Sequence, residues 1–301
     1  MSTIKIILNP IAGRGYGARS EPEIRRLLKA EGVAFDLVRT RSHGDAIALA
    51  EQAGRDGHQI VVAAGGDGTT HEVVNGLMAA AQGDVAGTLG VIPVGSGSDF
   101  ANTISIPPDI KGAVRQLAHG ETRIIDVCRV TVDDHPPRYF DNTVNVGFGG
   151  RVTWEARKVK WVRGMALYLP VVLKTIFLSR TPQITVEYDD ETLQGPLAMV
   201  CIANGPREGG GFFCTPDAKP DDGLFDLCIV REIGKLAMLG LVPHFMNGSH
   251  VDHERVTMTQ AKRIVISSSD NLIAHADGEM LCTEARRLIF EILPQRLRVR
   301  C

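Results

Sequence analysis

Apolar positions in the first 125 residues follow two alternating periods. Short apolar runs rich in β-branched residues predict strands at 4–8, 35–38, 60–64 and 88–92, and a further strand near Ile124. The segments between them have the apolar spacing of helices, near 20–31, 42–57, 70–78 and 111–118. Strands that alternate with helices predict crossover units, and therefore a mostly parallel sheet with helices on both faces.

The first helix has the sequence signals of a defined start and end. Ser20 and Glu23 form the pattern of a capping box, and Pro22 falls in the first turn that this box would open. Gly32 follows the last apolar position of the helix. The pattern therefore predicts a helix that begins at about Ser20 and ends before Gly32.

After Asp126 the pattern changes to strands separated by polar turns. These strands are predicted at 127–132, 139–146, 183–188, 197–203, 224–230, 263–267 and 288–293. Helical patterns interrupt them near 151–180 and 234–246. We therefore predict an α/β domain at 1–125 and a β-rich domain at 126–301, the second built as an antiparallel, β-sandwich-like sheet.

Composition narrows the function classes. A chain of 301 residues suits two domains, and a net charge near −2 gives no reason to expect nucleic acid as a partner. The six cysteines include no Cys-x-x-Cys pair, which favours buried reduced thiols in the cytoplasm. The N-terminus lacks the pattern of a signal peptide. The longest apolar stretch, 165–178, is shorter than the roughly 20 residues of a transmembrane helix, so we expect no membrane span.

The segment Gly65-Gly66-Asp67-Gly68-Thr69 joins the third predicted strand to a predicted helix. Backbone N–H groups at the start of a helix bind phosphate, and glycines let the backbone approach an anion closely. A carboxylate in such a turn would repel a bare phosphate, so Asp67 indicates either a divalent cation beside the phosphates or a group that accepts a proton. The alternative is an ordinary Asp-Gly turn.

Three other polar loops follow predicted strands of the same domain. Asn9 begins the first loop, Thr40 begins the second, and the third is Gly95-Ser96-Gly97-Ser98-Asp99-Phe100. The carboxyl ends of parallel strands meet at one edge of a sheet, which is where such folds bind ligands. The four loops together therefore predict a nucleotide site.

The ordered set of motifs resembles the bacterial diacylglycerol kinase-related lipid kinases, and the segment 146–152 is similar to the YegS-like branch. The set comprises Asn9-Pro10, 65–69, 95–100, Asn204-Gly205, 216–226 and Asp277-Gly278-Glu279, and it spans nearly the whole chain. This resemblance implies an ATP-binding domain and a β-rich lipid-substrate domain, with the active site in the cleft between them. It also implies transfer of the γ-phosphate of ATP to a hydroxyl of a membrane lipid such as diacylglycerol or phosphatidylglycerol.

The resemblance also implies roles for individual residues. The ATP contacts would be Asn9, Thr40, Gly65, Gly66, Asp67, Gly68, Thr69, Gly95 and Ser96. Asp67 would help to hold the catalytic Mg²⁺, and Glu279 would be the general base. Lys219, Asp222 and Leu224 match a second divalent-ion site for Mg²⁺ or Ca²⁺, to which Lys219 and Leu224 would offer backbone carbonyls.

The chain departs from the family pattern at two places. Ser98 stands where the family often has asparagine, which puts a contact of that amide in question. Gly149-Gly150 replaces the Asp-Ala of other branches, which leaves the acceptor lipid open.

Several alternatives remain open at this point. Asp67 and Glu279 are rival candidates for the base, and Asp277-Gly278-Glu279 also fits a plain hairpin turn. A kinase for a soluble substrate, of the NAD-kinase type, shares the Gly-Gly-Asp-Gly-Thr turn. A protein that binds nucleotide or lipid without catalysis is the second alternative, which the presence of Asp67, Asp99 and Glu279 argues against.

A last pattern concerns the membrane. On a helix over 151–163, Trp154 and Trp161 would lie opposite Val152, and Arg157 and Lys158 would flank them. Tryptophans bordered by cations suit the interface of an anionic bilayer, although they also suit packing on a neighbouring element. We expect a protein that meets its lipid peripherally at the inner membrane face. The sequence leaves a homodimer open.

Overall fold

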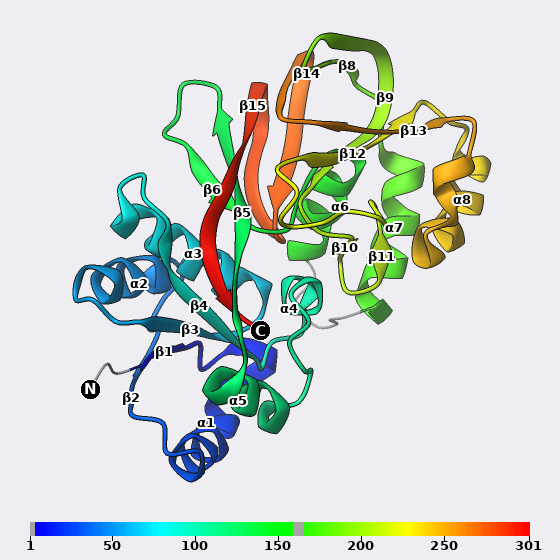
Figure 1. Ribbon diagram of the computed structural model, residues 1–301. Helices are drawn as coiled ribbons and strands as arrows, with labels where there is room; N and C mark the ends of the chain where they lie inside the picture. Colours follow the sequence, from blue (N-terminus) through cyan, green and yellow to red (C-terminus); the bar gives the residue numbers. More distant parts are fainter. Residues whose placement is uncertain (1–3, 159–164) are drawn as a thin grey trace. The chain divides into compact units, whose positions relative to one another are not determined.

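The computed structural model describes residues 4–158 and 165–301 (Figure 1). Packing divides the chain into two compact units, which are Met1–Val127 with Pro294–Cys301, and Cys128–Leu293. Two strands, β5 (Thr122–Val132) and β15 (Glu279–Arg300), each have residues in both units. The domain limits 1–125 and 126–301 stay a prediction. The segment Pro294–Cys301, which lies inside the second predicted domain, packs within the first unit.

The first unit contains the predicted alternation of strands and helices. Its sheet has the order β2-β1-β3-β4-β15, and every neighbouring pair in it is parallel. Its own strands are β1 (Ile4–Leu8), β2 (Phe35–Arg39), β3 (Ile60–Gly65) and β4 (Ala86–Pro93). Its helices are α1 (Ala12–Ala30), α2 (Asp45–Arg55), α3 (Asp67–Ala81), α4 (Asp99–Thr103) and α5 (Ile110–His119).

Helices cover both faces of this sheet because its strands are apolar on both sides. Ile6 and Leu8 of β1 pack with apolar side chains of α1 and α5, whereas Ile7 between them is equally buried and points to the other face. On that face α2 and α3 pack against each other (Figure 1).

Helix α1 departs from the predicted start at Ser20. It begins at Ala12, and a break at Gly13, Arg14 and Gly15, all with positive φ, interrupts it before the regular part. Ser20 is buried inside the helix, and its hydroxyl has no hydrogen-bond partner among the described residues, so it does not cap the helix as the predicted capping box requires. The predicted end is confirmed, since the helix stops at Ala30 and Gly32 is left-handed.

The second unit is an antiparallel sheet with helices beside it. Its strand order is β13-β12-β9-β7-β14-β15, while β8 pairs with β9 and β14, and β5 pairs with β6 and β15. The strands that complete it are β6 (Arg138–Phe140), β7 (Thr143–Gly147), β8 (Gln183–Tyr188), β9 (Glu191–Ala203), β12 (Phe225–Arg231), β13 (Val256–Ala261) and β14 (Arg263–Ala276). A separate short hairpin joins β10 (Arg207–Glu208) to β11 (Phe212–Phe213).

Three phenylalanines mark the core of this unit. Phe140 stacks on Phe225 with ring centroids 6.1 Å apart, and Phe290 meets Phe140 edge-on at 6.3 Å. All three side chains are fully buried. They come from β6, β12 and β15, so the core ties together strands that are far apart in sequence.

The predicted strand at 139–146 is two strands in the structure. It breaks at Asp141 and Asn142, where the carboxylate of Asp277 accepts hydrogen bonds from the backbone N–H groups of Asp141, Asn142 and Thr143. These N–H groups are buried and lie outside a regular ladder, so a carboxylate satisfies them instead. The break therefore depends on a residue more than 130 positions away, which local pattern does not show.

Three helices lie together in the second unit, and the short 3-10 helix Ser249–Asp252 follows the last of them. They are α6 (Phe148–Arg157), α7 (Met165–Leu178) and α8 (Lys235–Asn247). Val152 of α6 and Val172 of α7 share an apolar cluster with Leu239 of α8. Within residues 4–158 and 165–301, no helix is long and apolar enough to cross a bilayer.

Candidate nucleotide site and catalytic carboxylate

Four loops meet at one edge of the parallel sheet in the first unit, at the carboxyl ends of β1, β2, β3 and β4. Backbone hydrogen bonds join neighbouring loops. Asn9 N donates to Ala64 O at 3.0 Å, and Thr40 N donates to Leu8 O at 2.9 Å. Gly95 N donates to Gly65 O at 2.9 Å. The structure thus brings the predicted nucleotide contacts of this unit to one edge of its sheet.

The turn Gly65–Thr69 opens helix α3 directly. Gly66 is the N-cap residue, and as a glycine it has no side chain of its own to cap this helix terminus. Thr69 N donates back to Gly66 O at 2.9 Å, which closes the first turn tightly. The amides of Asp67, Thr69 and Thr70 already donate to backbone carbonyls. A phosphate at this terminus would therefore meet the amides of Gly66 and Gly68 and the positive end of the helix dipole.

Glycines are required where this turn meets the loop after β4. A Cβ atom on Gly95 would lie 2.3 Å from Gly66 Cα, and one on Gly66 would lie 2.9 Å from Gly97 O. A Cβ atom on Gly65 would lie 2.3 Å from Thr69 Oγ1. No side chain fits at these distances, so the glycines serve the close packing of two loops as well as any approach to an anion.

Asp67 connects the same two loops through its carboxylate. Its Oδ1 accepts a hydrogen bond from Phe100 N at 3.2 Å, and its own backbone N donates to Gly97 O at 3.3 Å. Asp67 also lies in the first turn of α3, where a negative charge is favourable. Its carboxylate is therefore oriented by two elements before any ligand is added.

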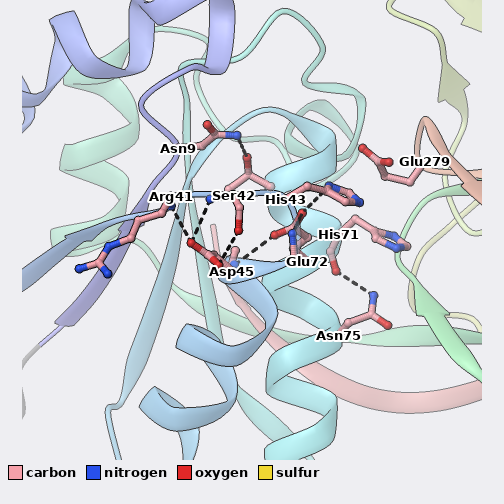
Figure 2. A network of polar contacts seen from close by, with 12 residues as sticks. Asn9, Arg41, Ser42, His43, Asp45, His71, Glu72, Asn75 and Glu279 are labelled. Carbon is pink, nitrogen blue, oxygen red and sulfur yellow. Dashed lines mark hydrogen bonds and ion pairs between the residues drawn. The ribbon is translucent and has the colours of Figure 1, made fainter. Parts of the chain in front are cut away.

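Asn9, Thr40 and Ser96 complete the predicted nucleotide contacts. Asn9 Nδ2 donates to Thr69 Oγ1 at 3.1 Å, which ties the first loop to the glycine turn (Figure 2). Thr40 is half-buried, and Ser96 is exposed at the tip of its loop. The three residues thus come from three loops at the same edge of the sheet, and the Asn9 side chain contacts the turn directly.

The loop after β2 is held by Asp45 at the start of α2 (Figure 2). The Asp45 carboxylate accepts hydrogen bonds from Arg41 N at 2.7 Å, Ser42 N at 3.0 Å and Ser42 Oγ at 2.8 Å. These hydrogen bonds lower the pKa of the Asp45 carboxyl, and the bond from the Arg41 amide has the largest effect.

Glu72 supports the same loop from the neighbouring helix. Its two carboxylate oxygens accept the backbone N–H groups of Gly44 at 2.9 Å and Ala46 at 3.1 Å, and His43 Nδ1 lies 3.0 Å from Oε1. A side chain of α3 thus caps the N-terminus of α2, and this role follows from the packing of the two helices rather than from any local motif.

In the second unit, Glu279 is the first residue after a tight hairpin turn. Asp277 and Gly278 both have positive φ, and Ala276 pairs with Glu279 across the turn. Asp277 and Gly278 therefore form the turn of a β-hairpin. The Asp-Gly-Glu motif was also compatible with such a turn from its sequence alone. Glu279 also forms an ion pair with Arg157 of α6, a partner that the sequence did not indicate.

The segment 217–226 concentrates acidic side chains around the predicted second ion site. Asp222 Oδ1 accepts a hydrogen bond from Leu224 N at 3.1 Å, and Lys219 and Asp222 are exposed. Burial raises the pKa of Asp226 to about 6, and repulsion from Asp222 and Asp217 adds to the effect, while a hydrogen bond from Gln260 opposes it. A cation in this segment would relieve that repulsion.

Comparison with known proteins now gives the family. The family model for the diacylglycerol kinase catalytic domain matches residues 3–130, and that for the YegS C-terminal NAD kinase beta sandwich-like domain matches residues 142–301. A diacylglycerol kinase of Bacillus subtilis is 30% identical over 284 residues, covering 93% of this chain and 90% of its own. The chain belongs to the diacylglycerol kinase family, with the YegS-like architecture.

Other relatives agree with this assignment. A diacylglycerol kinase of Staphylococcus epidermidis is 33% identical over 280 residues, which is 91% of this chain and 85% of its own. A crystal structure of a diacylglycerol kinase from Bacillus anthracis has the same fold, with a TM-score of 0.76 at 23% identity over 99% of this chain and 96% of the other. The predicted family and the two-domain architecture, catalytic and β-sandwich-like, are confirmed.

The unusual Gly149-Gly150 pair has a packing explanation. A Cβ atom on Gly149 would lie 2.3 Å from Asn145 Cγ, and one on Gly150 would lie 2.3 Å from Ile273 O of β14. The first turn of α6 thus lies directly against β7 and β14, where only glycine fits. This replacement in the family motif is required by the local packing of this chain.

Proposed function

We propose that this protein is an ATP-dependent lipid kinase, which transfers the γ-phosphate of ATP to a hydroxyl group of a membrane lipid. The observation that carries the proposal is the glycine turn at the start of α3, with the Asp67 carboxylate fixed beside it. Membership of the diacylglycerol kinase family supports the lipid as acceptor.

The nucleotide is proposed to bind at the carboxyl edge of the sheet in the first unit. Gly66 and Gly68 would present backbone N–H groups to its phosphates, and Thr69, whose own N–H donates to Gly66 O, would offer its side-chain hydroxyl. Asn9, Thr40 and Ser96 would supply polar side chains, and Gly65 and Gly95 would allow the close loop packing already described.

Asp67 is proposed as a ligand of the catalytic divalent ion, which we take to be Mg²⁺. Carboxylate oxygen is a ligand that Mg²⁺ prefers, and the second oxygen of Asp67, Oδ2, lies beside Gly97, where a Cβ atom would be 2.7 Å away. When bound, the ion would neutralise charge on the β- and γ-phosphates during transfer.

Glu279 is proposed as the general base. Its carboxylate would take the proton of the acceptor hydroxyl while that oxygen forms a bond to the γ-phosphorus, and the bond from phosphorus to the bridging oxygen of ADP breaks. The products are then the phosphorylated lipid, ADP and one proton. Asp67 is assigned to the metal ion instead, because its carboxylate is held at the start of α3, beside the proposed phosphate-binding turn, by the Phe100 amide.

A second divalent ion, Mg²⁺ or Ca²⁺, is proposed at 219–224. Asp222 would be the carboxylate ligand, and the backbone carbonyls of Lys219 and Leu224 would complete the protein ligands. The raised pKa of nearby Asp226 supports the proposal, because the accumulated negative charge of Asp217 and Asp222 is what a cation would offset.

The lipid is proposed to be reached through an apolar surface on α7, which we call the α7 face and which consists of Leu169, Leu173, Phe177 and Leu178. These side chains are 42%, 38%, 50% and 65% exposed. The opposite side of the same helix, including Val172 and Ile176, is buried against the unit. A helix that is apolar on its outer side as well needs an apolar medium, which a bilayer surface supplies.

Cations and an aromatic ring accompany the α7 face. Lys174 lies on its exposed side, and both Lys174 and Lys158 form ion pairs with Glu155 of α6. Trp154 is 39% exposed, and Lys158 Nζ lies 5.2 Å from the centre of its ring. This arrangement supports an anionic bilayer as the surface. Trp161, the second tryptophan of the predicted segment, lies outside the described residues.

The direct test is transfer of labelled γ-phosphate from Mg·ATP to lipids in vesicles, namely diacylglycerol, phosphatidylglycerol, ceramide and sphingosine, with NAD as a soluble acceptor. A labelled lipid is the expected result. Label in NAD alone would instead make this a soluble-substrate kinase, and ATP binding without any transfer would make it a non-catalytic protein.

Two variants test the assigned carboxylates. Asp67→Asn and Glu279→Gln should each fold and lose activity by about 10²-fold or more, since each removes a charge from the proposed chemistry. Glu291→Gln is the matched control, because Glu291 is a carboxylate of the same strand β15 that pairs with Arg129. Substantial activity in both variants would overturn the assignment.

A further inference from the structure

Three side chains of metal-ligand type converge in the second unit, and the proposed kinase chemistry uses none of them. They are Cys201 in β9, Glu208 in β10 and Cys214 directly after β11. The two sulfur atoms and a carboxylate oxygen of Glu208 all lie within 4.8 Å of one another. We call these three residues the thiol–carboxylate cluster.

The spacing of the cluster fits a tetrahedral ion. Zinc binds sulfur at about 2.3 Å and carboxylate oxygen at about 2.0–2.2 Å, so its ligand atoms lie roughly 3.5–3.8 Å apart. Cys201 and Cys214 are already joined by a hydrogen bond between their thiols. Since the three atoms already lie within 4.8 Å of one another, each pair needs to approach by at most about 1.3 Å to enclose an ion.

Glu208 is oriented as a ligand would be. Its Oε1 accepts a hydrogen bond from Asn145 Nδ2 at 2.9 Å. Its Oε2 is buried and has no hydrogen-bond partner among the described residues, and His275 Nε2 lies 4.0 Å away. A buried carboxylate oxygen without a donor is costly, and a cation would satisfy it, while Asn145 holds the other oxygen in place.

We propose that Cys201, Cys214 and Glu208 bind a zinc ion, with the fourth coordination position open to water. Two thiolates favour zinc over Mg²⁺ or Ca²⁺, which prefer sites made entirely of oxygen. This ion is separate from the divalent ions of the proposed kinase reaction.

A redox-active thiol pair is the other chemistry that two neighbouring cysteines offer. The hydrogen bond from Cys214 and burial both hold the pKa of the Cys201 thiol well above its usual range, and the carboxylate of Glu208 and the thiol of Cys228 add to the effect. Thiols react with oxidants as thiolates, so this environment suppresses oxidation. Zinc also binds the thiolates and releases both thiol protons to solvent, so zinc affinity at this cluster should rise with pH.

The proposed ion would stabilise a defined part of the chain. Cys201 lies in a central strand of the sheet, whereas Glu208 belongs to the short β10–β11 hairpin and Cys214 follows it directly. A shared ion would fasten this hairpin to β9. It would also fix the start of the segment that leads to the acidic residues 217–226.

The test uses the full chain purified without chelators. Metal content should show about one zinc per chain, and the cobalt-substituted protein should show sulfur-to-cobalt charge-transfer absorption of two thiolates. Cys201→Ser, Cys214→Ser and Glu208→Gln should each lower zinc content and affinity at least tenfold. Removing zinc from the wild type should lower its melting temperature.

Cys228→Ser is the matched control. Cys228 is the register partner of Cys201 on β12, is fully buried and belongs to the same apolar cluster, but lies outside the proposed ligands. The Cys228→Ser variant should keep its zinc. Circular dichroism should show that every variant in the comparison is folded.

Three outcomes would overturn the zinc site. They are a wild-type protein that neither contains nor binds zinc or cobalt, a cobalt spectrum without thiolate bands, and equal loss of zinc in the control and the ligand variants. None of these readouts uses phosphate transfer, so failure of the zinc site and failure of the proposed kinase activity are recorded separately.

Discussion

Arg157, the last residue of α6, forms an ion pair with Glu279, the first residue of β15. The guanidinium is about half exposed and the carboxylate is 20% exposed, so the pair lies at the surface of its unit with the carboxylate as the more buried partner. The two-residue turn before Glu279 fixes the position of its Cα atom. The ion pair with Arg157 fixes the direction of its side chain. Arg157 is thus a positioning residue for the proposed base.

The first prediction concerns this pair. Arg157→Gln should lower kcat about tenfold and change the KM for ATP little, because the nucleotide contacts are proposed in the other unit. Steady-state kinetics with lipid vesicles would measure both constants. Arg255→Gln removes a surface ion pair with Glu254 and is the control, which should keep full activity. An unchanged kcat for Arg157→Gln would mean that the pair does not position the base.

The second prediction concerns the contact between the two glycine loops. In Gly95→Ala, the new methyl group would meet Gly66 Cα at 2.3 Å, so the loops must separate. We expect a loss of about 1–3 kcal/mol in the free energy of unfolding and weaker ATP binding. Urea denaturation and ATP titration would measure the two effects.

Gly240→Ala is the matched substitution for that experiment. Gly240 lies within α8, where a Cβ atom would meet nothing within 4 Å, and alanine favours helix. Its free energy of unfolding should stay equal or rise. If both variants lose the same stability, the packing of the loops is not the cause.

The third prediction concerns the pH dependence of stability. The pKa of Asp226 is about 6 in the folded chain against an ordinary value of 3.8, so between these values the folded state holds a proton that the unfolded state has lost. This proton raises the free energy of unfolding below pH 3.8, and its contribution is lost as the pH rises through about 6. The total loss in the free energy of unfolding is about 3 kcal/mol. Asp226→Asn should remove this part of the pH dependence in urea denaturation.

The same residue reports on the proposed second ion. Mg²⁺ or Ca²⁺ bound at 219–224 should offset the repulsion on Asp226, and should therefore stabilise the wild type at pH 7 more than at pH 4.5. Asp222→Asn should abolish this stabilisation. Equal stabilisation of Asp222→Asn would place the ion elsewhere.

The fourth prediction concerns the α7 face. Each of Leu173→Ala and Phe177→Ala should weaken binding to anionic vesicles about fivefold, since each removes about 1 kcal/mol of apolar contact. Vesicle sedimentation would measure binding. Ile47→Ala removes an exposed apolar side chain from α2 and should have no effect. Equal binding by all three variants would exclude the α7 face from the membrane contact.

Much of the first unit could be predicted from its sequence. The spacing of apolar residues and the positions of turn residues there predict the same boundaries of strands and helices. The turn Gly65–Thr69 is one such boundary, at the end of a strand. The start of α1 was wrong because Ser20 has the residue type of a cap, but an earlier turn of the chain at Ala12 begins the helix. Local signals identify candidates, and packing decides between them.

The carboxylates Asp67, Asp277 and Glu279 also show which features the sequence predicts and which depend on tertiary packing. Asp67 and Glu279 were found as members of motifs, and the hairpin at Asp277-Gly278 follows from turn chemistry alone. The ion pair of Glu279 with Arg157 and the three amides held by Asp277 join residues more than 120 positions apart. No local pattern carries such a contact.

The sequence by itself determined the family, the alternation of strands and helices in the first unit and the loops that bear the proposed chemistry, because these depend on residue type and on spacing within a few turns of chain. The tertiary structure decided which distant segments meet. It added the last strip of β15 to the parallel sheet beside β4, and it gathered Cys201, Glu208 and Cys214 into one cluster. The physical reason is that strand pairing and core packing select among many possible long-range contacts, and a linear pattern does not encode that selection.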